Sequence, residues 1–188
     1  MHRELRIRGN IGGGEMTMES LKSASVSVEK VPPDVVFVDF EVVREGWNKY
    51  RLIQDETILK TKFVLINVIM EKNYKKIMEG AKTEKGLKIG FGFQSQNVIG
   101  VEAPARLRGE PDTKTYTIEE LRSSIVKEDL DFETLKETWN VYNLEDGITI
   151  KVRGAPIRVS RTSKFDSQGL PVYLVDSTAD VKVTLPKK

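Results

Sequence analysis

Apolar and polar residues alternate along several stretches of this chain, a pattern that predicts β-strands with one buried face. The first stretch covers residues 35–43. Shorter ones follow at residues 50–52 and 142–144, and each is succeeded by a stretch in which basic residues alternate, at 58–62 and 150–153. This spacing of short alternating segments predicts a mainly β protein.

Turn signals lie between the members of each pair of alternating stretches. Glu145-Asp146-Gly147 suits a tight hairpin, because Asp and Gly accept the backbone angles that such turns need. Residues 54–56 occupy the corresponding place earlier in the chain. The two stretches align with a slip of one residue at this turn, which predicts a bulge or an extra turn residue.

Two segments have helical patterns instead. Thr117-Ile118-Glu119-Glu120 has the spacing of a capping box, so we expect a helix from there to about Lys127. Residues 73–87 interrupt the β pattern, and residues 74–78 within them have helical character.

The same twenty-residue pattern occurs twice. Residues 39–58 read DFEVVREGWNKYRLIQDETI and residues 131–150 read DFETLKETWNVYNLEDGITI, with ten identical positions at an offset of ninety-two. Chance alone gives roughly one identity, since a typical residue has a frequency of about 5 to 7%. The sequence therefore predicts an internal duplication, and any site is expected to be doubled or to lie between the units. For this reason residues 131–139 are expected to form a strand like their counterpart, although Phe132, Leu135 and Trp139 have helical spacing.

These patterns predict a mainly β (α+β) fold of two tandem, related small β-units with a short helical insertion and a helical linker. Units this small bury little core alone, so we expect them to be barrel-like or to pack jointly about a pseudo-twofold axis. The expected division is an N-terminal extension at 1–33, a first β-unit at 34–105, an acidic linker with a helix at 106–130, and a second β-unit at 131–188.

The N-terminal extension is expected to be disordered or to precede the true start of translation. It contains the glycine run at 12–14, which is flexible, and it ends at Pro32-Pro33, which breaks helices. Gly-Gly-Gly-Glu is encoded by purine-rich codons that resemble a ribosome-binding site, so the hypothesis is a start at Met16 or Met18.

Composition excludes several classes of site. The chain has no cysteine, which excludes disulfides, thiolate zinc sites and cysteine nucleophiles, and its one histidine is His2. No apolar run is long enough to span a membrane, and no secretory signal is visible. We expect a cytoplasmic protein without a membrane partner. The absence of Cys with abundant Lys and Glu resembles the composition of thermophile proteins.

Charge is distributed in alternating blocks. Residues 59–108 carry ten Lys/Arg against four Asp/Glu, residues 109–146 carry four against eleven, and residues 150–188 carry eight against three. Basic blocks thus follow equivalent points in both units and favour an anionic partner. The alternative is that the acidic block neutralises the basic ones within the fold.

The basic residues are the main candidates for a nucleic-acid-binding site. Residues two apart on a strand share a face, so two basic strand faces would suit a phosphate backbone, although a solvated sheet face gives the same pattern. The candidates in the first unit are Lys60, Lys62, Lys88, Arg106 and Arg108, and those in the second are Lys151, Arg153, Arg158 and Arg161.

Aromatic residues could add base stacking. Gly90-Phe91-Gly92-Phe93 matches part of the glycine–aromatic signature of RNA-recognition sheets, with Phe91 and Phe93 as the stacking candidates. Ile89 stands where a basic residue belongs, and the alternative is a strand whose aromatics face the core. The repeated Trp-Asn-x-Tyr-x-Leu is interpreted as core packing, with its asparagines serving a local turn or bulge.

Enzymatic patterns are weak. The chain has no phosphate loop, no nucleotide-binding glycine pattern after a strand and no serine elbow. Asp39 with Glu41, and Asp131 with Glu133, could together bind a hard cation such as Mg²⁺, yet exposed strand faces have the same pattern. We expect no catalytic residue, no metal and no cofactor.

The leading hypothesis is a non-enzymatic binding module that contacts nucleic acid, either RNA or single strands, through basic strand faces. The alternative is a structural or assembly protein that forms a homo-oligomer or binds a protein partner, because internal symmetry and strand edges suit association. A carboxylate–metal enzyme is the third possibility.

Overall fold

The computed structural model describes residues 5–11, 35–76 and 91–186, and within these ranges the fold is mainly β, as predicted. All strand pairings are antiparallel. The strands of the first half are β1 Leu5–Ile11, β2 Val35–Val38, β3 Phe40–Arg44, β4 Asn48–Leu52, β5 Thr57–Glu71 and β6 Phe91–Glu102. Those of the second half are β7 Ile125–Lys127, β8 Phe132–Lys136, β9 Asn140–Leu144, β10 Thr149–Phe165 and β11 Pro171–Thr184. A 3₁₀ turn, η2 (Ala105–Leu107), and a helix, α2 (Ile118–Ser123), lie between the halves.

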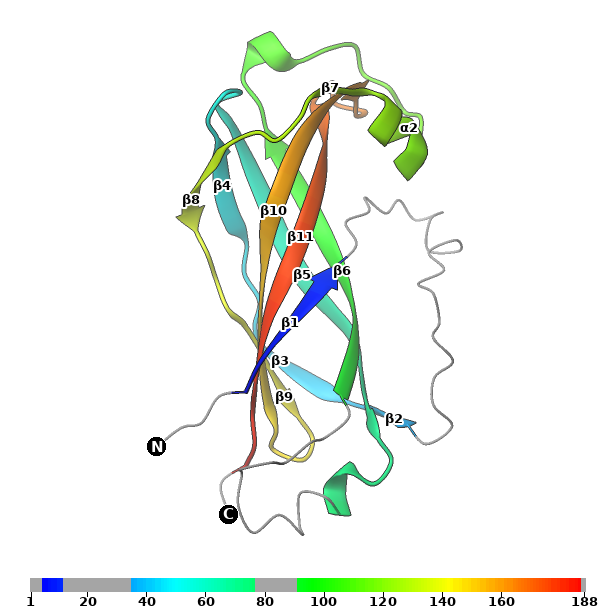
Figure 1. Cartoon of the computed structure of the whole chain (residues 1–188), viewed down its shortest axis with the longest axis vertical. Coiled ribbons are helices and arrows are strands. Elements are labelled where there is room, and N and C mark those ends of the chain that lie inside the picture. The colour runs from blue at the N-terminus through cyan, green and yellow to red at the C-terminus, as the bar shows by residue number, and fades with distance from the viewer. Residues whose placement is uncertain (1–4, 12–34, 77–90, 187–188) are drawn as a thin grey trace.

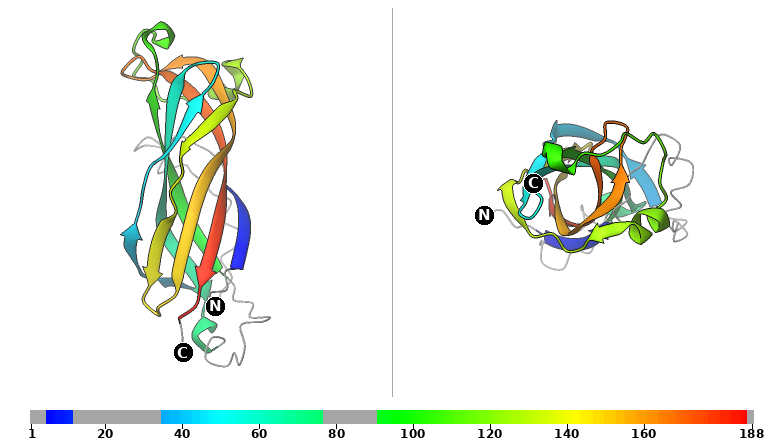
Figure 2. Two further views of the ribbon diagram at one scale, coloured as in Figure 1. Left: turned by 90° about the vertical axis from the view of Figure 1, so that its left-hand side faces the viewer. Right: turned by 90° about the horizontal axis from the view of Figure 1, so that it is seen from above.

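The strands form two sheets that face each other (Figures 1 and 2). The larger sheet has the order β1-β11-β10-β9-β3, with β7 also paired to β10. The smaller sheet has the order β2-β5-β4-β8, with β6 on the other side of β5. Within the described residues the strands do not close into a barrel, so the barrel-like alternative is not confirmed.

One strand of each half belongs to the sheet of the other half. Strand β3 pairs with β9, placing Phe40 opposite Leu144, and β8 pairs with β4, placing Phe132 opposite Leu52. These two pairings are related by the sequence offset of ninety-two, and both contain a register shift near their ends. The similar segments 39–58 and 131–150 therefore adopt corresponding strands, while their origin by duplication stays a prediction.

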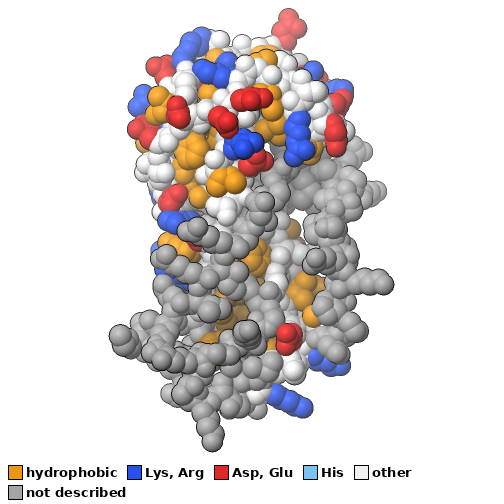
Figure 3. Space-filling view, viewed as in Figure 1, with side chains coloured by type: hydrophobic (Ala, Val, Ile, Leu, Met, Phe, Trp, Pro, Cys, Tyr) orange, Lys and Arg blue, Asp and Glu red, His pale blue; other side chains and the backbone are white. Residues whose placement is uncertain are grey.

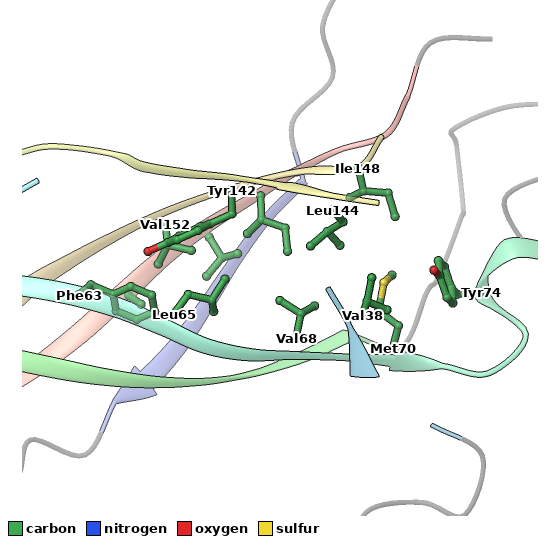
Figure 4. Packing of buried hydrophobic residues seen from close by; sticks show 13 residues of the cluster. Val38, Phe63, Leu65, Val68, Met70, Tyr74, Tyr142, Leu144, Ile148 and Val152 are labelled. Carbon is green, nitrogen blue, oxygen red and sulfur yellow. The ribbon is translucent and has the colours of Figure 1, made fainter. Parts of the chain in front are cut away.

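The two halves share their hydrophobic core. One cluster of buried residues combines Phe63, Leu65 and Val68 with Tyr142, Leu144 and Val152, and these side chains face each other from opposite sheets (Figure 4). A second cluster combines residues from β4 and β5 with others from β10 and β11. Because each cluster needs both halves, neither half can bury these side chains alone.

The chain passes between the sheets in two short segments, residues 45–47 and 137–139, which meet each other. Gly46 and Thr138 occupy equivalent positions, and a Cβ added at Gly46 would lie only 2.8 Å from Thr138 Cγ2. A small residue on one side makes this close approach possible. We refer to residues 45–48 and 137–140 together as the crossover.

Two buried asparagines hold the crossover together. The backbone N–H of Gly46 donates to Asn140 Oδ1 at 3.0 Å, and the backbone N–H of Thr138 donates to Asn48 Oδ1 at 2.7 Å. The side-chain amide of Asn48 donates to the Gly154 carbonyl at 2.8 Å, and the side-chain amide of Asn140 donates to the Phe63 carbonyl at 2.7 Å. The expectation that these asparagines serve a local turn or bulge is wrong, since each bonds to the opposite half.

Two tyrosine–glutamate hydrogen bonds also join the halves, one in each direction. Tyr50 donates to Glu137 Oε1 at 3.2 Å, and Tyr142 donates to Glu45 Oε1 at 3.0 Å. Burial raises the pKa of both phenols above the usual value of 10.0, and the neighbouring carboxylates raise it further. The hydroxyl groups therefore remain donors to the carboxylates at neutral pH.

The linker helix begins as the sequence predicts and ends earlier. The Thr117 side chain accepts from the Glu120 backbone, and the Glu120 carboxylate accepts from Thr117, so the capping box is confirmed. The helix ends at Ser123, not near Lys127, because residues 125–127 pair with β10 as β7.

The hairpins confirm the predicted one-residue slip. Asn48 pairs with Thr61, whereas the equivalent Asn140 pairs with Val152, which makes the second hairpin one residue shorter. Gly147 has a φ of 75° in the shorter turn, an angle that favours glycine.

The predicted strand at 35–43 is divided at Asp39, because β2 and β3 lie in different sheets. Of the predicted N-terminal extension, residues 5–11 form β1, which the sequence patterns do not predict, and β1 pairs with β11 over seven positions.

The start-site hypothesis and most of the insertion at 73–87 concern residues outside the described ranges; residues 74–76 are helical as expected. No helix within the described ranges is long and apolar enough to cross a membrane.

Candidate nucleic-acid interface

The predicted basic residues at the middle of the sheets lie on two outward faces. Side chains of β5 alternate between buried and partly exposed positions, and Lys60 and Lys62 occupy the partly exposed ones. Lys151 and Arg153 on β10 correspond in register to Lys60 and Lys62 on β5. The offset between them is ninety-one residues and not ninety-two, because the second hairpin is one residue shorter. The two sheets pack through their inner faces, so these pairs point in opposite directions.

Most of these cations are already paired with carboxylates. Lys60 forms a salt bridge with Glu102, and the pKa of Glu102 is lowered chiefly by this hydrogen bond. Lys62 Nζ lies 3.0 Å from Glu45 Oε2, and the equivalent Arg153 Nη1 lies 2.8 Å from Glu137 Oε2. Arg153 also contacts Asp180 at 2.7 Å. Much of the basic charge at these positions is therefore neutralised within the fold, although of these four carboxylates only Glu137 belongs to the acidic block at residues 109–146.

A row of lysines nevertheless crosses the outer face of the smaller sheet. Lys136, Lys49 and Lys60 are consecutive cross-strand partners on β8, β4 and β5, and Gly100 of β6 continues the row. Lys136 and Lys49 are exposed, and neither forms a salt bridge with any described residue. We call Lys136, Lys49 and Lys60 the first basic row.

A corresponding row crosses the outer face of the larger sheet. Arg44, Val141, Lys151 and Lys182 are consecutive partners on β3, β9, β10 and β11. Arg44 is exposed, and its Nε donates to the Trp139 carbonyl at 2.9 Å. We call Arg44, Lys151 and Lys182 the second basic row. Within the described part of the chain, no carboxylate forms a salt bridge with Lys151.

Each row is accompanied by one of the two tryptophans. Trp47 is 38% exposed, and its Cζ3 would lie 3.9 Å from a Cβ at Gly100, which places the ring beside Lys60 on the outer face. Trp139 has two cations over its ring, with the ring centroid 5.0 Å from Arg153 Cζ and 4.8 Å from Lys182 Nζ. The core interpretation of the repeated motif holds for Tyr50, Tyr142 and the leucines, whereas neither tryptophan belongs to a core cluster.

The aromatic residues of β6 lie differently. Phe93 packs against the core, with its ring centroid 5.9 Å from that of Phe63 in an edge-on arrangement. Its side chain is therefore partly buried against the core, and stacking on a base stays a prediction. Lys88 and the side chain of Phe91 lie outside the described parts of the chain.

The remaining basic candidates lie at the end of the molecule that contains η2, α2 and the β4–β5 hairpin (Figure 1). Arg106 pairs with Glu56 at 2.8 Å, and Arg158 pairs with Asp129 at 3.2 Å. Arg161 Nε lies 3.5 Å from Asp55 Oδ2. Basic and acidic side chains interleave over this end in the surface view (Figure 3). Arg108 is exposed, and no described carboxylate forms a salt bridge with it.

Asp55 is the centre of the charged groups at this end. Its side chain is only 2% exposed and accepts a hydrogen bond from Tyr173 at 3.0 Å. Lys127 Nζ lies 3.7 Å away and Arg106 donates to the Asp55 carbonyl at 3.2 Å. These contacts tie the β4–β5 hairpin to η2, β7, β10 and β11, and they engage Arg106 and Arg161 in the fold.

The carboxylates of the second predicted pair contact side chains of the first half. Glu133 lies 3.6 Å from Arg51, and Asp131 accepts from Gln54 at 2.7 Å. Across the described residues, no group of three Asp, Glu, His or Cys side chains is arranged to hold a metal ion.

Sequence analysis missed four members of the rows, namely Arg44, Lys49, Lys136 and Lys182. Their membership depends on cross-strand register, including the exchange of β3 and β8 between sheets, and residues on the same strand give no sign of it. The signal that could have found them is the equivalence of Arg44 and Lys136 at an offset of ninety-two. No family model, curated protein or solved structure matches the chain.

Proposed function

We propose that this protein is a non-enzymatic module that binds single-stranded nucleic acid on its two outer sheet faces. Each face would use its basic row for the phosphates and its tryptophan for a base. Neutralising phosphates supplies affinity without sequence preference, and stacking of a base on an aromatic ring adds about 1–3 kcal/mol. The double helix is a less suitable ligand, because its bases are not free to stack.

The observation that carries the proposal is the position of the tryptophans. A large aromatic side chain is usually buried in the core. Here both tryptophans of the chain lie on outward faces beside lysine and arginine, and they do so at equivalent places. A partly exposed ring flanked by cations is the combination that stacking on a nucleic-acid strand requires.

We also propose that the two faces are duplicated sites about a pseudo-twofold axis at the crossover. The reciprocal bonds of Asn48 and Asn140 support this, as do the matching pairs Lys62–Glu45 and Arg153–Glu137. Because the faces point in opposite directions, one short strand cannot reach both. The expected stoichiometry is therefore two short oligonucleotides for each chain.

The test uses the tryptophans as reporters, since one lies on each face. Labelled oligo(U) and oligo(dT) of about 12 nucleotides, matching the span of a single-strand site, are titrated at about 20 and about 200 mM salt. We expect quenching of tryptophan fluorescence together with a rise in anisotropy of the label. Affinity is expected to fall steeply with salt.

Double variants test the contribution of each face to binding separately. Lys49→Gln with Lys136→Gln removes two charges from the first row, and Arg44→Gln with Lys151→Gln does so in the second. Removal of each cation that binds a phosphate is expected to reduce the salt slope by about 0.7. The matched control is Lys72→Gln with Lys76→Gln, two exposed lysines just beyond the end of β5. Absence of binding at low salt, or an equal effect of the control, would contradict the proposal.

A further inference from the structure

A hollow of about 350 Å³ opens on the outer face of the larger sheet, where α2 and β7 lie beside β10 (Figure 1). Ser160 of β10 and Leu174 of β11 are cross-strand partners, and both line it. Their side chains point outward, because the adjacent residues Val159 and Val175 belong to the second core cluster. Small-molecule sites have volumes of about 300–1,000 Å³, so the hollow suits a small ligand.

The lining combines apolar side chains with one buried hydroxyl. Ile118 of α2, Ile125 of β7 and Leu174 supply the apolar part. Ser160 is only 4% exposed, and within the described chain its hydroxyl forms no hydrogen bond. Its oxygen is not among the fully enclosed atoms that lack a partner, so it is open to the hollow. Buried polar groups are nearly always hydrogen-bonded, and this one has room for a partner only in the hollow.

The fold does not require a hydroxyl at this position. The two halves correspond in register here, and the residue of the first half that is equivalent to Ser160 is Ile69. The next outward pair of the first half, Asn67 and Gln94, is uncharged, and its amides form a hydrogen bond of 2.7 Å. The second half therefore carries a polar, charged lining where the first half has an apolar residue and a satisfied amide pair.

The charged lining is only partly neutralised by its own members. Arg158 and Asp176 take the positions of Asn67 and Gln94 and lie opposite each other on β10 and β11. Arg158 Nε, however, pairs with Asp129 Oδ1 at 3.2 Å. Among the described residues, no cation forms a salt bridge with Asp176, although it is directly across the strand from an arginine.

Two further charges lie at the rim. Arg122 of α2 and Glu128 both line the hollow and are exposed, and in the described part of the chain neither forms a salt bridge. The segment after Glu128 is fixed against the sheet, because Leu130 is buried and its N–H donates to the Val159 carbonyl at 2.8 Å. The hollow thus offers one guanidinium and two carboxylates that no described side chain neutralises.

We infer that the hollow binds a free α-amino acid with an apolar side chain, of which leucine is the representative. Its ammonium group would pair with Asp176 and Glu128, its carboxylate would pair with Arg122, and its side chain would contact the apolar lining. A zwitterion uses both signs of unpaired charge at once, and the Ser160 hydroxyl can bond to either of its charged groups. The inference does not depend on nucleic-acid binding, because neither basic row contains any of these residues.

Titration of the isotope-labelled full chain with L-leucine, followed by NMR, tests the site. Saturable shifts are expected for the backbone amides of Ser160, Leu174 and Ile125, with a Kd of about 1 mM or lower. Absence of shifts at these amides in about 20 mM leucine would overturn the inference.

Two analogues test the zwitterion. Leucinamide lacks the carboxylate and isocaproate lacks the ammonium group, so each loses one ion pair with the lining. Each is expected to bind at least about tenfold more weakly than leucine. Affinity equal to that of leucine for either analogue would overturn the assignment.

Variants of the lining locate the ligand. Ser160→Ile fills the hollow with the residue that the first half carries as Ile69, and it is expected to weaken leucine binding at least about tenfold. Asp176→Asn and Arg122→Gln change exposed side chains and leave the fold intact, and each is expected to weaken binding about fivefold or more. The matched control is Glu119→Gln, an exposed residue of α2 outside the lining. Wild-type affinity in Asp176→Asn and Arg122→Gln, or an equal loss in the control, would overturn the inference whether or not Ser160→Ile folds.

Discussion

The two halves of the molecule are alike where they touch each other and only partly alike where they face outward. At the crossover, Asn48 and Asn140 make the same bonds in opposite directions. On the outer faces the equivalent positions diverge, with Gly100 beside Trp47 and Lys182 beside Trp139. The identities between segments 39–58 and 131–150 thus concentrate at contacts between the halves.

Contacts between the halves explain most of the residues repeated in segments 39–58 and 131–150 without a role in ligand binding. Glutamate accepts from the tyrosine of the other half, asparagine binds the backbone of the other half, and leucine fills the shared core. Each residue has a structural partner that only the opposite copy provides. Tryptophan is the exception, since its ring contacts outward-facing groups of its own sheet.

The largest effect is expected from breaking the reciprocal asparagines. Asn48→Ala leaves the Thr138 N–H and the Gly154 carbonyl without their partner, and Asn140→Ala does the same for Gly46 and Phe63. Each variant is expected to lower the free energy of unfolding by about 2–4 kcal/mol, because a buried unsatisfied group costs about 1–3 kcal/mol. Urea denaturation measures this, and a cost confined to one of the two variants would refute the equivalence of the halves.

The next largest effect on stability is expected at Gly46 and Thr138, equivalent positions of the crossover where only one side can carry a large residue. Gly46→Thr would bring two threonines together where Cβ already has only 2.8 Å to Thr138 Cγ2, and overpacking of this kind costs about 1–3 kcal/mol. Thr138→Gly in the same chain restores one small and one large residue. Thermal unfolding is expected to show the single variant destabilised and the double variant near wild type; a double variant no better than the single one would contradict this account.

Sequence analysis predicted the elements better than it predicted their partners. The alternation located the strands of the repeated segments but not β1 or β7. The Thr117–Glu120 capping box located the start of α2, and the one-residue slip was recovered in the hairpin registers. The exchange of β3 and β8 could not be predicted, because alternation specifies which face is buried and not which strand lies alongside. For the same reason, the ion pairs of Lys62 and Arg153 and the two basic rows were not foreseen.

The reciprocal tyrosines predict a decline of stability at alkaline pH. Burial, followed by the adjacent glutamate, raises the pKa of Tyr50 and Tyr142 in the folded chain. Their contribution is complete below pH about 10, where the unfolded phenols are also neutral, and it is lost as pH rises above that value because the unfolded chain releases its protons first. Each tyrosine is expected to contribute a slope of about 1.4 kcal/mol per pH unit in that range.

Tyr50→Phe and Tyr142→Phe test this slope. Each variant is expected to lose about 1–2 kcal/mol near neutral pH, since a hydrogen bond to a carboxylate is removed. Each is also expected to have a shallower decline above pH about 10 than the wild-type chain. Unfolding by urea at a series of pH values checks both effects, and an unchanged alkaline slope in the double variant would show that other groups cause the decline. Tyr173, whose pKa is also raised by burial, remains in every variant as a common background.

The smallest effect is expected from making the two outer faces alike. Gly100→Lys supplies the cation that Lys182 provides on the other face, and its Cβ would have only an ordinary contact of 3.6 Å with Lys60 Cβ. The change removes a glycine from a strand interior and adds a cation beside Trp47, so stability is expected to rise by about 0.5–1 kcal/mol. Lys182→Gly is the reverse substitution and should cost a similar amount, because Trp139 loses one of its two cations. If single-stranded nucleic acid binds through the faces, the first change strengthens binding and the second weakens it. Equal affinity in both variants would place the ligand, if there is one, away from the tryptophans.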